Sequence, residues 1–509
     1  MKPQKVVIVG AGINGLVAAN YLARAGFEVT LIERADHVGG ACVSATAEVD
    51  GIRADYAHGA SVLGLMQDFV WRDTGLEGRL QAFAPTHPKL IHFPGHAEPV
   101  WIYREADRLD REFADRFGER GDAAAFRADE ARVVAFLQEG YRRARPPSLD
   151  DARAALGPQL AKLWISGSAR QLLEHYFTSE AVRVYMAMTV TESGPVGLAE
   201  PYSAFTIPMM DSGSVFGGYY GFVRGGIWQV TAELGRINSE LGVEVFLGSS
   251  VAGVDAAASQ LWWTAGGRQH SLGFDHLLLA TDPVTAARLV GDAGLVARTQ
   301  GQRLLGSAGK LNLMFRKPVR WRHGSELPDS DTAFRFIFGP DTLAGFEEAA
   351  AQVATGSIDY APGYLQIYCE GAAMRHMQLG EPFDRLAVFF NFLALDQPGE
   401  ALTGVHRRVR ETVLGHIANP EDCAWSRLLS PYDLQQTFGF PGGNLDHTML
   451  VGGQTYFDRN YADDPATRFY QLGSLENVML CGAGTYPCGS VAGTPGYMCA
   501  RQLIRQQPG

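Results

Sequence analysis

The sequence predicts an α/β fold built on a Rossmann-type dinucleotide-binding domain, with an interleaved α+β domain and a helical insertion. Three observations predict it. An apolar run at 6–9 leads into Gly10-Ala11-Gly12-Ile13-Asn14-Gly15, a helical pattern follows over 16–25, and a second β-branched run at 29–32 ends on Glu33. Together they make a β-α-β unit with an acid at the end of its second strand.

The residue types of this unit suit a bound dinucleotide. Gly10 permits the tight turn, Gly12 lets the backbone approach the pyrophosphate, and Gly15 lets the helix pack close to the strand. The helix N-terminus then presents unpaired N–H groups to the phosphates. Glu33 can accept hydrogen bonds from ribose hydroxyls and disfavours a 2'-phosphate. The alternative, a tight turn that binds nothing, is disfavoured by the complete pattern.

Length and composition restrict the remaining classes. A chain of 509 residues exceeds what one core usually supports, so two interleaved domains are expected. Hydrophobic residues make up 46%, and no apolar run is long enough to span a bilayer or to act as a signal peptide, so we expect a cytoplasmic protein. The net charge of -11 disfavours a nucleic-acid partner, while peripheral membrane contact and a homodimer are left open.

The six cysteines argue against a metal site. They are scattered, with no Cys-x-x-Cys spacing and no cysteine-histidine pairing, so no metal is expected and a reduced compartment fits best. A redox-active cysteine pair does not follow the first β-α-β unit, which disfavours a disulfide reductase.

A second glycine pair decides which dinucleotide is expected. Gly39-Gly40 follows Glu33, and Glu33-Arg34 to Gly40-Ala41 resembles the FAD-binding fingerprint of the glutathione-reductase-like flavoprotein superfamily. The resemblance implies FAD, with the second pair against the pyrophosphate and ribityl chain. Amine oxidases of this superfamily typically carry Arg after the pair, whereas Ala41 and Cys42 stand here, which disfavours a standard amine oxidase.

Two further blocks extend the resemblance. Residues 217–283, with an Arg-Gly-Gly segment, a helix and several strands, resemble the phytoene desaturases and the pyridine nucleotide-disulfide oxidoreductase domain-containing proteins, which implies an adenine contact at Val251. Seen without the family, this block is an αβ unit whose glycines only permit turns. The segment from Asn477 to Tyr497 resembles the strand, glycine loop and terminal helix that approach the ribityl phosphate and flavin in that family. The residues predicted to bind the cofactor are Gly10, Gly12, Ile13, Asn14, Gly15, Glu33, Arg34, Gly39, Gly40, Ala41, Cys42, Val251, Gly484, Val491 and Gly493.

Catalytic candidates are fewer. Lys310 lies near the start of an expected strand, 307–315, and the resemblance to amine oxidases implies a water-mediated contact with flavin N5; the alternative is a lysine that reaches solvent. His58 and His447 are candidates to line the catalytic cavity, although lone histidines are more often structural. Cys488 could anchor flavin covalently, but a packing role is favoured.

These observations predict a discontinuous FAD-binding domain, 1–102, 217–300 and 430–509, a helical subdomain or lid, 103–216, and a substrate-binding domain, 301–429. The predicted function is an FAD-dependent oxidoreductase that moves a hydride from a largely apolar substrate to flavin N5, with C–C desaturation as the reaction. Two alternatives remain: an amine oxidase that acts at a C–N bond, and a non-catalytic binder like the GDP-dissociation inhibitors. Oxygen, a quinone or another acceptor would reoxidise the flavin.

Overall fold

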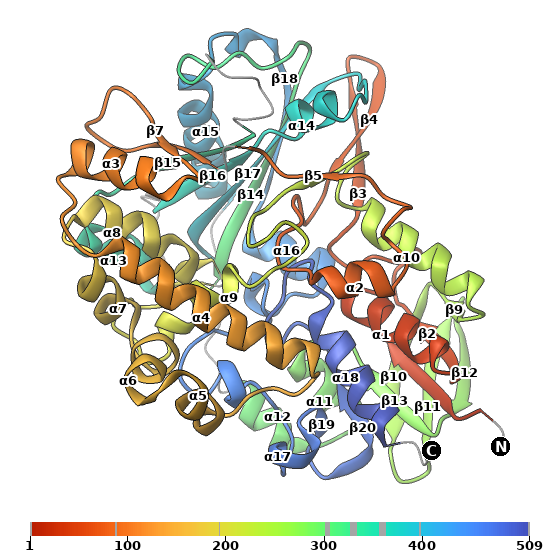
Figure 1. Ribbon diagram of the computed structural model, residues 1–509. Helices are drawn as coiled ribbons and strands as arrows, with labels where there is room; N and C mark the ends of the chain where they lie inside the picture. The colour runs from red at the N-terminus through yellow and green to blue at the C-terminus, as the bar shows by residue number, and fades with distance from the viewer. Residues whose placement is uncertain are drawn as a thin grey trace.

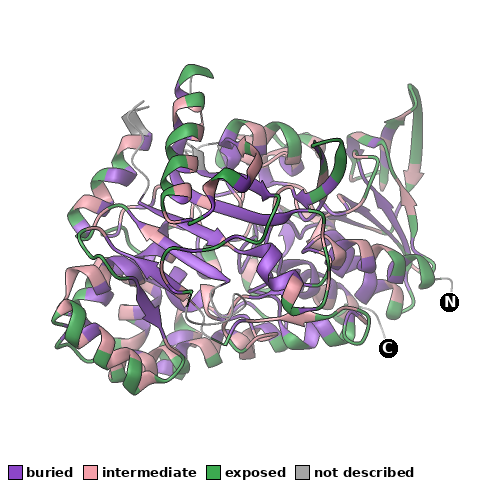
Figure 2. Ribbon diagram, turned by 90° about the horizontal axis from the view of Figure 1, so that it is seen from above, coloured by how far each residue is buried: buried purple, intermediate pink, exposed green. Residues whose placement is uncertain are grey.

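The computed structural model describes residues 3–86, 89–192, 194–300, 306–325, 333–355, 363–395 and 399–506. Two large sheets organise them, one near the two termini and one at the opposite end of the molecule (Figure 1). Helices cover both sheets, and the strands between them are mostly buried (Figure 2). In the described residues, no helix is both long and apolar enough to cross a membrane.

The first sheet has six strands in the order β19-β20-β13-β1-β2-β9. Its strands are β1 (Lys5–Val9), β2 (Glu28–Ile32), β9 (Glu244–Phe246), β13 (His276–Leu279), β19 (Gln471–Leu472) and β20 (Leu475–Leu480). All neighbours run parallel except β19 and β20. The sheet is covered on both faces, and the last four residues of β1 are therefore apolar and buried. The sheet unites both ends of the chain with its centre.

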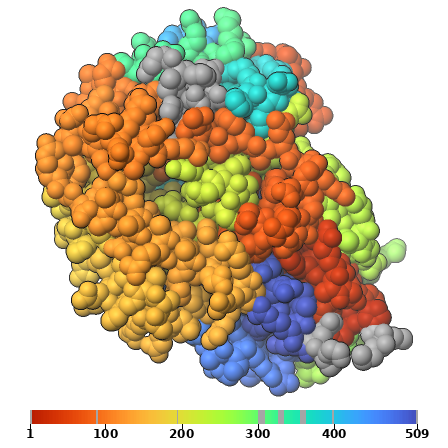
Figure 3. All heavy atoms as spheres, in the orientation of Figure 1, coloured from red at the N-terminus to blue at the C-terminus, as the bar shows by residue number. Residues whose placement is uncertain are grey.

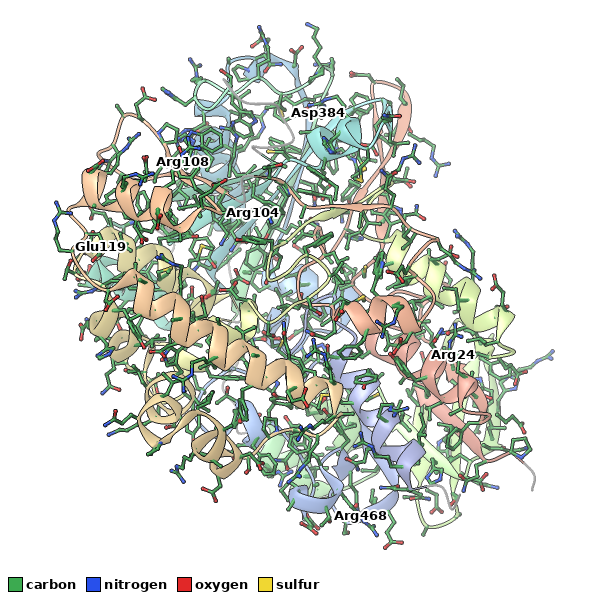
Figure 4. The ribbon with its side chains drawn as sticks, in the orientation of Figure 1. Arg24, Arg104, Arg108, Glu119, Asp384 and Arg468 are labelled. Carbon is green, nitrogen blue, oxygen red and sulfur yellow. The ribbon has the colours of Figure 1, made fainter. Side chains whose placement is uncertain are left out.

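Three helices pack together on one side of this sheet: α1 (Ile13–Arg24), α10 (Gln229–Glu240) and α18 (Thr494–Arg505). Asn20 of α1 donates to Asn238 of α10 at 3.0 Å, and the Tyr21 and Tyr497 rings meet with centroids 4.8 Å apart. Arg24, labelled in Figure 4, donates to the Thr74 carbonyl at 3.3 Å. The contacts fix α1, and therefore the glycine corner at its start.

The second sheet has seven strands in the order β18-β14-β17-β16-β15-β6-β7. They are β6 (Lys89–His92), β7 (Val100–Ile102), β14 (Gly306–Phe315), β15 (Phe334–Phe338), β16 (Tyr364–Tyr368), β17 (Asp384–Ala394) and β18 (Cys423–Leu429). The expected strand at 307–315 falls within β14. One assignment differs from the prediction: β6 and β7, placed in the dinucleotide domain by the range 1–102, belong to this sheet because β6 pairs with β15.

The segment 103–216 is helical. Its helices are α3 (Ala106–Phe117), α4 (Ala123–Arg142), α5 (Leu149–Leu156), α6 (Pro158–Ala161), α7 (Ala169–Tyr176), α8 (Glu180–Ala187) and α9 (Thr206–Met210). In α4, Asp122 caps the N-terminus by accepting from the Ala125 N–H at 2.9 Å. Phe126, Val133, Leu137 and Tyr141 form its buried stripe.

Further helices and small sheets belong to the described fold. The helices are α2 (Asp68–Asp73), α11 (Pro283–Leu289), α12 (Ala293–Gln300), α13 (Leu343–Thr355), α14 (Glu370–His376), α15 (Gly399–Gly415), α16 (Pro431–Phe438) and α17 (Pro465–Arg468). A three-stranded sheet contains β10 (Ser249–Asp255), β11 (Gln260–Ala265) and β12 (Arg268–Gly273), and two strand pairs join β3 (Ser44–Val49) to β4 (Ile52–Ala57) and β5 (Ala82–Phe83) to β8 (Phe222–Val223). The predicted boundary between 300 and 301 adjoins residues 301–305, which lie outside the described residues.

Candidate active site

The glycine corner between β1 and α1 is built by main-chain geometry. Gly10 has φ +101°, and its N–H donates to the Ile32 carbonyl at 2.9 Å. A Cβ on Gly15 would lie 2.0 Å from the Gly10 carbonyl oxygen, whereas one on Gly12 would meet only the Gly40 Cα at 3.8 Å. Gly15 therefore packs the helix onto the strand, and Gly12 leaves space in front of the helix N-terminus.

Glu33 fastens the end of β2 to this corner. Its Oε2 accepts from the Ala11 N–H at 2.7 Å, and its Oε1 accepts from the Ala35 N–H at 2.9 Å. The carboxylate is 9% exposed and lines the cavity described below. The acid predicted to bind ribose thus also shapes the loop that would hold the pyrophosphate.

The second glycine pair lies against the first. Gly39 and Gly40 have φ of +129° and +60°, and the Gly39 N–H donates to the Ala11 carbonyl at 2.8 Å. A Cβ on Gly40 would lie 3.1 Å from the Gly12 Cα. Next to the pair, Cys42 is buried, and burial raises the pKa of its thiol to about 12. A neutral Cys42 acts as a small packing residue.

The predicted C-terminal segment, Asn477 to Tyr497, also reaches the cavity described below. Val251 of β10 and Val491 line the cavity, whereas Gly484 and Gly493 are not among its lining residues. A Cβ on Gly484 would lie 2.5 Å from the Pro283 ring, and one on Gly493 would lie 2.6 Å from Val17 of α1. Gly493, with φ +68°, precedes α18 and lets that helix approach α1.

These segments surround a cavity of about 730 Å³. From the first sheet it receives the glycine corner, and from the second sheet Lys310, Tyr368 and Phe389. Of the predicted cofactor residues, those that line it are Gly10, Gly12, Ile13, Asn14, Glu33, Arg34, Gly39, Gly40, Ala41, Cys42, Val251 and Val491. Figure 3 shows a hollow between the orange helical segment and the yellow-green segment after residue 200, which supplies Met210 and Tyr220 to the lining.

Lys310 ties the second sheet to the loop after β4. Its Nζ donates to the carbonyls of Ala57 at 2.6 Å, Gly59 at 2.8 Å and Ala60 at 3.4 Å. Burial lowers the pKa of Lys310 to about 7, whereas the three carbonyl acceptors favour the ammonium form. All three N–H donors have backbone partners, so Lys310 positions the loop. Its water-mediated role at a flavin stays a prediction.

The two candidate histidines line the cavity with unpaired nitrogens. His58 Nε2 and His447 Nδ1 are buried atoms with no hydrogen-bond partner. Burial lowers the pKa of His58 to about 4 and also lowers the pKa of His447. Both rings are therefore neutral near pH 7, and each has a nitrogen free for a ligand. Cys488 also lines the cavity, and burial raises the pKa of its thiol.

Sequence analysis missed Glu192. It lies directly after the 3-10 turn η2 (Met188–Thr191) and lines the cavity together with Tyr220 and Tyr368. Burial raises the pKa of Glu192 to about 7. The alternation in Tyr364–Tyr368 places Tyr364, Gln366 and Tyr368 on one face of β16, but no pattern near Glu192 signals a site.

Within the described ranges, no group of three or more His, Cys, Asp and Glu side chains is arranged to hold a metal ion.

Comparison with known proteins agrees with this architecture. Residues 8–69 match the family model of the NAD(P)-binding Rossmann-like domain. The chain is 26% identical to an uncharacterized protein of Mycobacterium tuberculosis, over 98% of this chain and 96% of the relative. It is 23% identical to the pyridine nucleotide-disulfide oxidoreductase domain-containing protein 2 of Rattus norvegicus, over 99% of this chain and 94% of the relative.

Two further matches extend the comparison. A 4,4'-diapophytoene desaturase of Staphylococcus aureus is 26% identical over 48% of this chain and 49% of the relative. The solved structure of a putrescine oxidase triple mutant has a TM-score of 0.59 and 16% identity, over 99% of this chain and 98% of its own. At that identity the similarity shows a shared fold, and the predicted fold class is confirmed.

The homologues of the chain and the proteins that share its fold are flavin-dependent oxidoreductases, and this is the class to which the chain is similar. Within that class, its homologues include a pyridine nucleotide-disulfide oxidoreductase domain-containing protein and a diapophytoene desaturase. The predicted resemblance and enzyme class are confirmed, and FAD is confirmed as the cofactor of this class.

Proposed function

We propose that the protein is an FAD-dependent dehydrogenase that removes a hydride from an organic, largely apolar substrate and leaves a new carbon-carbon double bond. The observation that supports it most is the continuity of the cavity. A single space of about 730 Å³ joins the glycine corner to side chains of the second sheet and the helical segment. A dinucleotide at the corner and a substrate in the remaining space would therefore meet.

The residues at the corner fit FAD. Gly12 and Gly40 face each other without side chains, and the N-terminus of α1 carries no side-chain cap, so its N–H groups remain available for a pyrophosphate. Asn14 Oδ1, His58 Nε2 and His447 Nδ1 are buried atoms without partners, which suits contact with a polar ring system. When bound, FAD supplies a two-electron acceptor for the substrate hydride.

The chain's own residues would exclude water and orient the substrate. Tyr220, Tyr368 and Phe389 offer an aromatic wall, which favours an apolar substrate. Lys310 holds the loop that carries His58 beside this wall. The side chains that line the cavity, rather than the fold, determine which substrate the protein binds.

Oxidation of an amine at a C–N bond is the second candidate. The carboxyl group of Glu192 in the cavity favours it, because an ionised carboxylate can pair with a substrate ammonium.

Spectroscopy of purified protein tests these proposals. A visible flavin band, present on isolation or after addition of FAD, is expected. Under anaerobic conditions, a polyene should bleach that band and a primary amine should not. Bleaching by the amine alone would favour the second candidate. Absence of flavin under both conditions would contradict both and favour a non-catalytic binder.

A further inference from the structure

Glu192 is an acid in the wall of the cavity that the proposed dehydrogenation would use. A dehydrogenation removes a hydride from one atom and a proton from its neighbour, and the mechanism above gives the proton no destination. Glu192 lines the same cavity as the glycine corner and is the acid that the helical segment, 103–216, contributes to the lining.

Hydrogen bonds from the second sheet place Glu192. The Gln366 Nε2 of β16 donates to its Oε1 at 2.7 Å. The Tyr368 hydroxyl donates to the Gln366 Oε1, which turns the amide nitrogen toward Glu192. Because Gln366 donates to it, Glu192 is held as an acceptor.

The turn that carries Glu192 is fastened as well. Asn391 Nδ2 of β17 donates to Thr191 Oγ1 at 2.8 Å, and the Tyr364 hydroxyl donates to the Met188 carbonyl at 3.1 Å. Both ends of the turn before Glu192 are thereby attached to the sheet. This arrangement preorganises the carboxyl group at the cavity wall.

Glu192 is not held in an ion pair by a described residue, so its carboxylate can accept a proton. Among the residues that the structure describes, no Lys, Arg or His forms an ion pair with it within 4.0 Å. Burial raises the pKa of Glu192, the hydrogen bond from Gln366 and the charge of Lys89 lower it, and Asp446 and Asp211 raise it. The phenols that face it are Tyr220, Tyr364 and Tyr368. The nearby acids Asp211 and Glu130 hydrogen-bond to each other, and Lys89 faces both.

We propose that Glu192 is the proton acceptor of the dehydrogenation. The inference rests on the proposed function. The substrate loses a hydride, with both electrons of its C–H bond, to the oxidised cofactor. Glu192 takes the proton from the neighbouring carbon, and the electron pair left behind forms the double bond. Glu192 becomes a neutral acid and returns the proton to water after the product leaves.

The test compares Glu192→Gln with Glu130→Gln. The first keeps the shape of residue 192 and removes its basicity, and the second replaces a nearby acid that does not line the cavity. In anaerobic rapid mixing, Glu192→Gln should slow flavin reduction about a hundredfold or more without weakening substrate binding, and the acid limb of the pH profile should disappear. Glu130→Gln should reduce like the wild type.

A readout independent of turnover uses the apoprotein. Infrared difference spectra should show a carboxyl band that titrates near pH 7 in the wild type and in Glu130→Gln and that is lost in Glu192→Gln. Should Glu192→Gln fold poorly, Glu192→Asp should keep the carboxyl signal and part of the pH-dependent rate.

The outcomes separate the two proposals. A wild type without flavin contradicts the proposed function itself. A flavin-containing Glu192→Gln protein that is reduced at the wild-type rate contradicts only the role of Glu192. Weaker binding of cationic substrates with an unchanged reduction rate also contradicts it, because Glu192 would then bind charge and accept no proton.

Discussion

The two walls of the cavity are built in different ways. The dinucleotide wall, Gly10 to Gly40, consists mainly of backbone from one short stretch of chain, with φ of +101°, +129° and +60° at Gly10, Gly39 and Gly40. The other wall consists of side chains, Glu192, Tyr368 and Phe389, from separate segments of the chain. The first wall is therefore shaped by missing Cβ atoms, whereas the second depends on how distant segments are held together.

The largest expected effect comes from adding a Cβ atom where the surrounding backbone leaves no space for one. In Gly15→Ala the new atom would lie 2.0 Å from the Gly10 carbonyl oxygen, so α1 must move away from β1. We expect a loss of about 3 kcal/mol or more in the free energy of unfolding, together with loss of bound FAD. Chemical denaturation and flavin content measure the two effects.

Gly404→Ala is the matched control. Gly404 lies within α15, and a Cβ there would meet no atom within 4 Å. Alanine in a helix is favoured over glycine by about 1 kcal/mol, so this variant should be slightly more stable and keep its flavin. Normal flavin content in Gly15→Ala would show that the corner tolerates rearrangement.

The second-largest expected effect is a loss of FAD affinity without a loss of folding stability. In Gly12→Ala the new Cβ would meet only the Gly40 Cα at 3.8 Å, and Gly12 has φ -72°, which suits alanine. The apoprotein should therefore unfold like the wild type. FAD affinity should fall about a hundredfold because the methyl group would occupy the space for the pyrophosphate. Fluorescence titration of the apoprotein with FAD checks this, and equal affinities would place the pyrophosphate elsewhere.

The same contrast explains what the sequence could predict. The first glycine segment, Glu33 and the pair Gly39-Gly40 were predictable, because each meets a local demand of the main chain. Glu192 was not, because it is placed by Gln366, which lies 174 residues away, and its turn by Asn391, 200 residues from Thr191. The range 1–102 included β6 in the dinucleotide domain for a similar reason, since only its pairing with β15 decides its sheet.

Lys310 joins the two walls, so its replacement should have an intermediate effect. Lys310→Met removes the donor to the carbonyls of Ala57, Gly59 and Ala60. We expect a loss of about 1–2 kcal/mol in the free energy of unfolding, because a buried hydrogen-bond network is broken while the cost of burying an ammonium disappears. We also expect slower flavin reoxidation by oxygen, followed by stopped-flow absorbance.

Lys162→Met serves as the control, since Lys162 is exposed on the helical segment. It should change neither stability nor reoxidation. Unchanged reoxidation in Lys310→Met, with reduced stability, would limit Lys310 to positioning the loop and remove its predicted role at the flavin.

The smallest expected effect is the contribution of His58 to the pH dependence of folding stability. Burial lowers the pKa of His58 to about 4, below its ordinary value of 6.5, so the folded protein prefers the neutral ring. Its contribution to stability is complete above pH 6.5 and is lost as the pH falls through 4. His58 is half-buried, so water screens the penalty, and we expect only about 1 kcal/mol over this range.

His58→Gln should flatten the decline of the melting temperature between these pH values, and His96→Gln, at an exposed position, should not. Bound FAD should enlarge the difference if the free His58 nitrogen contacts it, because protonation would then cost a ligand contact as well. An equal slope in His58→Gln and the wild type, with and without FAD, would remove His58 from the acid response and from the cofactor site.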